Sequence, residues 1–299
     1  MTDSIRRSRD YHLYSESGQR FLDLYMDGGG AFCGHRPHGL TASLKRVLSR
    51  GGLAAVPNRE CQRAVNAITS LPRKLTLNLP EAEYRVCWLP PGLPVTALAA
   101  VFASTSLQVY DCWSRGAAAV PASSSIVLLR PGYSRAQLLQ QLQGKLAASG
   151  QLVAAVVPVL PVPRGIAPQP VLLRSDIPQP DIALDVPAEI GAKAVVNGVQ
   201  LLLDPQFPSW SAKRSDIIWQ PRSFEQRGWN NWASSGPYQY FSGTDSDYHI
   251  WYSAALAMGV LLPPDRFSPA IMPSVVSACE DTVLDRLHTA GKNANTEGI

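Results

Sequence analysis

The stretch that most constrains the fold of this chain is Tyr84–Ser104, with the sequence YRVCWLPPGLPVTALAAVFAS. Residues 84–89 are aromatic, apolar or β-branched, as expected for a buried strand, and Leu98, Val101 and Phe102 then recur at helical spacing. A turn rich in proline and glycine separates the two parts. The sequence therefore predicts a strand, a turn and a helix, which is the repeating unit of an α/β sheet.

The turn itself combines a favourable position with unfavourable residues. In an open α/β sheet, the end of a strand and the start of the next helix offer free N–H groups and a positive dipole end, which suit a phosphate. Here the turn is Pro90-Pro91-Gly92-Leu93-Pro94. Proline has no N–H to donate, and no side chain of this turn carries a hydroxyl. The position favours a phosphate-bearing cofactor, whereas the residues disfavour it.

The residues before this stretch predict a hairpin followed by two helices. Residues 11–24 form two apolar-aromatic runs around Ser17-Gly18, which is typical of a hairpin. Three glycines at 28–30 indicate either a close backbone approach or a flexible loop. Residues 41–50 predict an amphipathic helix, and Asn58 is placed to cap a second one.

The residues after it predict alternating strands and helices, and then a less regular part. Strands are expected at 107–113, 125–130 and 151–160, and a helix at 134–150, so we expect a doubly wound, mainly parallel sheet. Seven prolines between 158 and 180 exclude a long helix there. We expect short strands at 181–186 and 194–203, a loop at 209–235, a helix at 245–258, and a final helix that a capping box at Ser277 and Glu280 starts.

Composition narrows the class of protein. With 299 residues, 45% apolar and 17% charged, the chain can bury a sizeable core, as one large domain with a smaller one attached. A net charge of +4 is spread thinly, apart from Arg6, Arg7 and Arg9, so we expect no nucleic-acid partner. No apolar run approaches the length of a membrane span and no apolar leader follows the first residues, so we expect a soluble cytoplasmic protein with no membrane partner.

Neither the cysteines nor the histidines form a metal-binding pattern. The five cysteines are scattered without paired spacing, and we interpret them as reduced thiols. His35 and His38 have a spacing that metal ligands use, but no cysteine or carboxylate accompanies them in the sequence. We therefore expect backbone groups to bind these histidines, and we expect no metal.

Both ends of the chain resemble class III aminotransferases. Residues 11–48, YHLYSESGQRFLDLYMDGGGAFCGHRPHGLTASLKRVL, resemble the opening of that family, and residues 259–287, GVLLPPDRFSPAIMPSVVSACEDTVLDRL, resemble the close of its glutamate-1-semialdehyde aminomutase branch. The resemblance implies the fold type I architecture of enzymes that use pyridoxal phosphate (PLP). It implies a large α/β domain at 51–235 with a mainly parallel sheet, and a smaller α+β domain that both chain ends form, at 1–50 and 236–299.

The resemblance also assigns roles to single residues. The family's phosphate-binding turn, an Asn-Ser-Gly-Thr-Glu-Ala pattern, falls on Pro90–Val95, where only Gly92 is kept. The aspartate that pairs with the pyridine nitrogen of PLP matches Asp185 in LDVPAEIG. An aspartate there would hold that nitrogen protonated and make the ring an electron sink.

The remaining two roles are matched by position only. Tyr110 or Trp113 lies where the family has the residue that stacks on the cofactor ring. Lys213, in SWSAKRSD, lies at about the family spacing from Asp185 for the lysine that forms the Schiff base, although the glycine-rich sequence expected after it is missing. Lys193 is too close to Asp185 for that role.

Two functional hypotheses follow. The favoured one is a degenerate homologue with weakened or lost PLP binding that acts as a binding or regulatory protein. The alternative is an active transaminase or aminomutase that acts on a small amino-group substrate, with Lys213 as its catalytic lysine. A third class, an α/β enzyme with a nucleophile elbow or a nucleotide loop, is excluded because the chain has none of those motifs. We expect a homodimer, because family active sites form between subunits and because the aromatic segment 210–240 would otherwise expose apolar surface.

Overall fold

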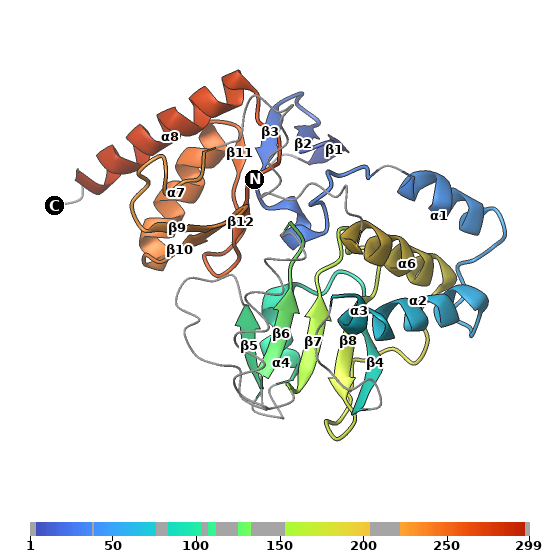
Figure 1. Cartoon of the computed structure of the whole chain (residues 1–299). Coiled ribbons are helices and arrows are strands. Elements are labelled where there is room, and N and C mark those ends of the chain that lie inside the picture. The colour runs from blue at the N-terminus through green and yellow to red at the C-terminus, as the bar shows by residue number, and fades with distance from the viewer. Residues whose placement is uncertain are drawn as a thin grey trace. The chain divides into compact units, whose positions relative to one another are not determined.

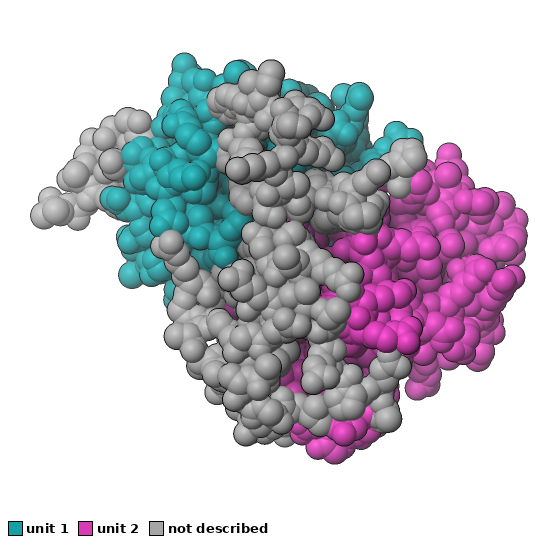
Figure 2. All heavy atoms as spheres, in the orientation of Figure 1, with its two compact units in different colours: residues 1–36, 210–299 teal, residues 37–209 magenta. Residues whose placement is uncertain are grey.

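The structure is a computed structural model that describes residues 4–37, 39–75, 83–102, 107–111, 125–132, 153–203 and 222–296. The chain divides into two compact units (Figure 2). We call residues 37–209 the sheet unit, and residues 1–36 with 210–299 the terminal unit. Each unit is described by itself.

The sheet unit is built on a five-stranded sheet (Figure 1). Its strand order is β4 (Tyr84–Leu89), β8 (Gln169–Arg174), β7 (Ala155–Pro158), β6 (Ser125–Leu129) and β5 (Gln108–Asp111). Strands β5, β6 and β7 run parallel to one another, whereas β8 is antiparallel to both of its neighbours. The sheet is therefore mixed and not mainly parallel, because the connection at 159–168 is short and turns the chain straight back, as antiparallel neighbours allow.

Strand β8 was not predicted, because Pro170 lies inside it and Pro168 directly before it. Pro170 lies inside the strand and pairs with Trp88 of β4. On the other side, β7 pairs only with Leu172 and Leu173, so Pro170 lies beyond the β7 ladder, where its missing N–H leaves no gap. The strand expected at 181–186 is reduced to a single bridge between Leu184 and Trp88. The helix expected at 134–150 lies outside the described residues.

Helix α6 (Glu189–Leu203) contradicts the strand predicted at 194–203. A short run that is apolar on every side is compatible with either element. Gly191 and Gly198 recur seven residues apart on one face of this helix, where they allow a close approach to the connection between β7 and β8. A Cβ atom on Gly198 would lie 2.9 Å from Cβ of Leu160, so this face packs closely against the connection between β7 and β8.

Helix α6 contacts two other helices of the sheet unit, α1 (Leu40–Leu48) and α2 (Arg59–Thr69). Both were predicted. The side chain of Asn58 accepts a hydrogen bond of 2.9 Å from the N–H of Cys61, which confirms the cap of α2. The described part of the unit also contains short helices: α3 (Leu71–Lys74), and after β4 the 3₁₀ turn η3 (Val95–Ala97) and α4 (Leu98–Val101).

The terminal unit joins the two ends of the chain through a sheet. Its strand order is β1 (Ile5–Arg9), β2 (His12–Ser15), β3 (Arg20–Asp23) and β11 (Val260–Leu261). The expected hairpin is confirmed, since β2 and β3 pair antiparallel around the turn at Ser17-Gly18. Strand β11 pairs parallel with β3, and Leu22 lies opposite Val260. The 3₁₀ turn η1 (Met26–Gly29) follows β3, with Asp27 and Gly28 in the left-handed region.

A second small sheet and two long helices complete this unit. The sheet order is β12 (Ala270–Ile271), β10 (Tyr238–Phe241) and β9 (Trp232–Ser235). Helix α7 (Asp245–Ala257) starts at Thr244, which forms a capping box with Asp247. Helix α8 (Ala278–Thr296) starts at the predicted Ser277 and Glu280 box and passes Gly291.

The described part of the segment expected as a loop supplies Phe224, Trp229 and Trp232 to the core of the terminal unit. Trp229 stacks between Phe224 and Trp251, with ring centroids 3.8 and 4.6 Å away. Trp232 meets the same cluster edge-on. The tryptophans of this segment that the structure describes are buried, so they do not support the argument for a dimer that the sequence suggested.

The boundaries of the units differ from the predicted ones at 50 and 235. The first change lies at Pro37, because α1 packs on α6 inside the sheet unit. The second lies at Trp210, and residues 222–241 belong to the terminal unit because their aromatic side chains form its core. Within the described parts of the chain, no helix combines the length and apolar character that crossing a bilayer requires.

Candidate functional site

The turn between β4 and η3 is closed by contacts within the protein. Gly92 takes a left-handed φ of 80°. Its N–H donates a hydrogen bond of 2.7 Å to the carbonyl of Arg164. The guanidinium of Arg164 in turn donates to the carbonyl of Leu93 at 3.4 Å. The N–H that the sequence offered to a phosphate therefore already has a partner in the connection between β7 and β8.

The helix that follows the turn is too short to serve as an anion site. After η3, α4 makes a single turn from Leu98 to Val101, so few aligned peptide dipoles point at the turn. A hollow of about 480 Å³ lies beside these elements. Among the described residues, its lining includes the carboxylate of Asp181 and no cationic side chain; these residues are Ala97, Ala100, Val101, Phe102, Pro178, Gln179, Pro180, Asp181 and Ile182. These residues do not fit a phosphate dianion.

Asp185 lies on the surface, just after the bridge that holds Leu184 to β4. The N–H of Leu184 donates to the carbonyl of Trp88 at 2.7 Å. The pairing is antiparallel, so the chain continues from Leu184 toward the level of Cys87 and away from the turn at Gly92. The Asp185 side chain is exposed, and an exposed carboxylate in high dielectric holds a ring nitrogen protonated only weakly. The structure does not bring Asp185 and Gly92 together.

Tyr110 lies at the opposite edge of the same sheet. The pairing register places Tyr110, Val127, Val156, Leu172 and Val86 in one row across the five strands. Four strand spacings separate Tyr110 on β5 from Val86 on β4, which is about 19 Å at roughly 4.8 Å each. Strand β5, which holds Tyr110, and strand β4, which leads to the turn at Gly92, are therefore the two edge strands of this sheet. Trp113, the alternative for the stacking role, lies outside the described residues.

Two lysines were considered for the Schiff base, and the structure describes one of them. Lys213, predicted as the Schiff-base lysine, lies outside the described residues. Lys193 lies on α6 with its amino group 3.6 Å from a carboxylate oxygen of Glu60 on α2. Lys193 is thus part of the packing between two helices.

The carboxyl ends of the parallel strands hold an ion pair that the sequence analysis missed. Arg130 follows β6, and its Nε lies 2.7 Å from Oδ2 of Asp111 at the end of β5. Both side chains are largely buried. An arginine directly after a buried strand is a signal that the sequence did offer. The pair occupies the sheet edge where α/β proteins usually bind ligands.

The histidine prediction needs a correction. The ring of His35 bonds to the buried carboxylate of Asp23 at 2.8 Å and not to a backbone group. That carboxylate also accepts the N–H groups of Tyr25 and Met26, so the pair fastens the loop after β3. His38 lies outside the described residues. Among the residues that the structure does describe, no group of three metal-ligating side chains is present.

Sequence comparisons give relatives without a known function. No family model matches the chain. An uncharacterized protein of Treponema pallidum is 24% identical in an alignment 292 positions long, which covers 91% of this chain and 89% of that protein. An uncharacterized protein of Borreliella burgdorferi is 38% identical over 64 residues, so the match spans 21% of this chain and only 24% of that relative's length.

Structural comparisons agree on the fold. The acetylornithine aminotransferase of Elizabethkingia anophelis matches 98% of this chain and 94% of its own, with a TM-score of 0.61 and 11% identity. An ornithine aminotransferase of Toxoplasma gondii, whose structure has partial occupancy of PLP at its active site, matches 99% of this chain and 92% of its own, with a TM-score of 0.58 and 12% identity. At such identities the likeness extends to the fold alone. The chain is therefore a mixed α/β protein whose fold is that of class III aminotransferases over nearly its whole length.

Proposed function

We propose that this chain uses the aminotransferase fold as a scaffold for binding or regulation, with PLP binding weakened or lost. One observation carries the proposal. At the turn where a phosphate would lie, the N–H of Gly92 is bonded to the carbonyl of Arg164, and three of the other four residues are prolines.

The energetic consequence is large for a doubly charged phosphate. Hydrogen bonds to a charged group contribute on the order of 1.5–3 kcal/mol each. Pro91 and Leu93 stand where class III aminotransferases have a serine and a threonine. At least two such donors are therefore missing. Their loss is equivalent to a hundredfold to ten-thousandfold weaker binding, by order of magnitude. The early end of α4 removes the helix dipole as a compensation.

The positions of the other candidate residues support the same proposal. Strand β4, which leads to Gly92, and strand β5, which holds Tyr110, lie at opposite edges of the sheet, and Asp185 is exposed. Cofactor catalysis requires that one site fix the reactive ring by several groups at once. A protein that binds a partner or a regulatory ligand at another surface does not need these residues to lie close together.

The test is an absorbance spectrum of the purified protein before and after addition of PLP. We expect no stoichiometric PLP and no visible band of a lysine-bound cofactor. A variant with Pro91→Ser and Leu93→Thr restores two donors and should bind PLP more tightly than the natural chain. A yellow protein whose colour disappears in Lys213→Ala would overturn the proposal in favour of the alternative, an active transaminase or aminomutase.

A homodimer is part of the proposal, on a different basis from the one that the sequence suggested. The loop between α1 and α2 exposes apolar side chains in succession, including Leu53, which is 64% exposed, and Val56. Neighbouring Leu48 is also exposed. Adjacent exposed apolar residues favour association. A light-scattering mass that stays at the monomer value across micromolar concentrations would contradict it.

A further inference from the structure

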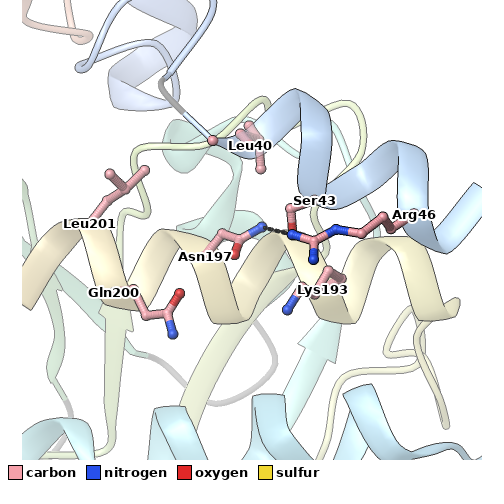
Figure 3. Close-up of a pocket in the computed structure, with 8 residues that line it drawn as sticks. Leu40, Ser43, Arg46, Lys193, Asn197, Gln200 and Leu201 are labelled. Atoms are coloured by element: carbon pink, nitrogen blue, oxygen red, sulfur yellow. Dashed lines mark hydrogen bonds between the residues drawn. The ribbon is translucent and has the colours of Figure 1, made fainter.

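A polar hollow of about 350 Å³ lies between helices α1 and α6 of the sheet unit (Figure 3). It is within the size range of small-molecule sites. It is separate from the turn at Gly92, and none of its residues has a role in the family resemblance. Its lining comes from one face of each helix: Gly39, Leu40, Ser43 and Arg46 from α1, and Lys193, Asn197, Gln200 and Leu201 from α6.

The spacing of these residues explains why they share the hollow. Leu40, Ser43 and Arg46 recur every three residues on α1, so they form one stripe. Lys193, Asn197 and Leu201 recur every four residues on α6 and form the facing stripe. Asn197 donates a hydrogen bond of 3.0 Å to the hydroxyl of Ser43, which joins the two helices at this place. The Ser43 hydroxyl proton remains available to a ligand.

The charge of the lining is positive. Arg46 is exposed, and no carboxylate in the described part of the chain forms an ion pair with it. Lys193 lies 3.6 Å from Oε2 of Glu60, which is beyond hydrogen-bond distance. The other oxygen of that buried carboxylate bonds to Arg63, while Oε2 has no hydrogen bond. Glu60 is thus shared between two cations, and neither Arg46 nor Lys193 has a full hydrogen-bonded counter-ion.

The polarity of the lining changes along the hollow. Figure 3 shows Arg46 and Lys193 at the same end, approaching from opposite helices, and Leu201 at the other end. Asn197 and Gln200 lie between them, and Leu40 lies on the α1 side. An anionic group at the first end would meet two cationic donors, and an aliphatic chain would extend toward the leucines.

We propose that this hollow binds a small organic carboxylate with a short aliphatic chain. The carboxylate lies between Arg46 and Lys193, the Ser43 hydroxyl and the amide of Gln200 bond to its oxygens, and the chain packs on Leu40 and Leu201. Inorganic phosphate lacks the aliphatic part, and an alcohol lacks the charge, so both should bind more weakly. This inference goes beyond the proposed function and does not depend on whether PLP binds.

The experiment is a titration of the full chain, with ¹³C-labelled leucine methyl groups, against sodium hexanoate. We expect saturable shifts of the Leu40 and Leu201 methyl signals at about millimolar concentration, as the usual efficiency of small ligands implies. We expect Arg46→Gln and Lys193→Gln each to weaken binding about tenfold, since each removes one charge-assisted contact. Lys45→Gln is the matched control, because Lys45 is exposed on α1 and does not line the hollow; it should change the affinity less than twofold.

With the natural chain, any of three results would overturn the proposal: no saturable shift with hexanoate, equal affinity for hexanoate and 1-hexanol, or equal affinity for hexanoate and inorganic phosphate. Arg46→Gln keeps the test valid even if Lys193→Gln disturbs the fold through Glu60, because Arg46 is exposed and has no ion pair in the described chain. An Arg46→Gln protein that binds hexanoate as tightly as the natural chain would also count against it.

Discussion

The cores of the two units are built from different kinds of side chain. The terminal unit packs large rings against one another: Phe224, Trp229, Trp232, Phe241, Tyr248 and Trp251. The sheet unit packs mostly aliphatic side chains on paired strands, such as Ile126, Val157 and Val171. In the terminal unit, a few large rings pack together chain segments that are distant in sequence. In the sheet unit, each aliphatic side chain contributes a smaller part of the buried apolar area. Single substitutions should therefore cost more in the terminal unit.

The largest expected effect is that of Trp251→Ala. Trp251 is 1% exposed and contacts Trp229 and Trp232, so its removal leaves a cavity at the centre of the ring cluster. We expect a loss of about 3–5 kcal/mol. Urea unfolding, with amide hydrogen exchange to separate the two units, measures it.

A conservative change in the sheet unit is Ile126→Val, at a fully buried position of β6. It should cost about 0.5–1.5 kcal/mol. If Trp251→Ala costs no more than Ile126→Val, the contrast between the two cores is wrong.

The second prediction concerns Arg227, a fully buried cation of the terminal unit. It pairs with Asp281 and, at 2.6 Å, with Asp285 of α8. Among the described residues, Arg227→Met leaves the buried Asp281 with one cationic partner, the half-exposed Arg222, and we expect a loss of about 3 kcal/mol by urea unfolding. Arg222→Met is the control, because its side chain is 49% exposed; it should cost at most about 1 kcal/mol.

The third prediction examines the close packing of the sheet unit. Gly198→Ala places a methyl group 2.9 Å from Cβ of Leu160, so α6 must move away from the connection between β7 and β8. We expect a loss of about 1–3 kcal/mol, although alanine by itself favours a helix. Gly165→Ala, where nothing lies within 4 Å, serves as the control. A Gly198→Ala protein more stable than the natural chain would show that α6 and Leu160 are not tightly packed.

The smallest expected effect is the acid sensitivity of the terminal unit. Burial raises the pKa of Glu280, but hydrogen bonds from Ser277 and His12 outweigh it, so the pKa is lowered below its ordinary value. A lowered pKa means that this stability is present above the ordinary pKa of a glutamate and is lost as the pH falls below it. The free energy of unfolding of the terminal unit should therefore decrease from about pH 4.5 downward.

The variant Glu280→Gln tests this assignment. Glutamine keeps the shape of the capping box but does not titrate, so the decrease below about pH 4.5 should become shallower. Equal acid slopes in the natural chain and the variant would place the sensitivity elsewhere. Asp285 is the next candidate, since hydrogen bonds from Arg222 and Arg227 outweigh the effect of burial and lower its pKa.

Local signals of the sequence predicted much of the fold. The strand at 84–89, the Asn58 cap and the Ser277 capping box are each decided by a few neighbouring residues, and all three are confirmed. Strand β8 and helix α6 depend on tertiary contacts. Pro170 is tolerated because β7 does not reach it, and Gly198 is needed because Leu160 lies beside it. Neither condition is visible in a window of the sequence.

The candidate site was less predictable, because a resemblance matches positions along the chain and not distances in space. It placed Tyr110 and Gly92 in one site, whereas the strand order puts their strands at opposite edges of the sheet. The donor-poor composition of the turn was readable from its prolines. The partner of Gly92 was not, because Arg164 approaches from a connection more than 70 residues later.

The parallel pairing of β3 with β11 also sets an order of events during synthesis. A ribosome releases β3 about 240 residues before β11. At roughly 5–20 residues per second, β3 waits on the order of 10–50 seconds for its partner. All residues of the sheet unit emerge within that interval, while Leu22 still lacks the C-terminal side chains that bury it in the finished protein. The nascent protein should thus mature from its middle outward, with its first hairpin docking last.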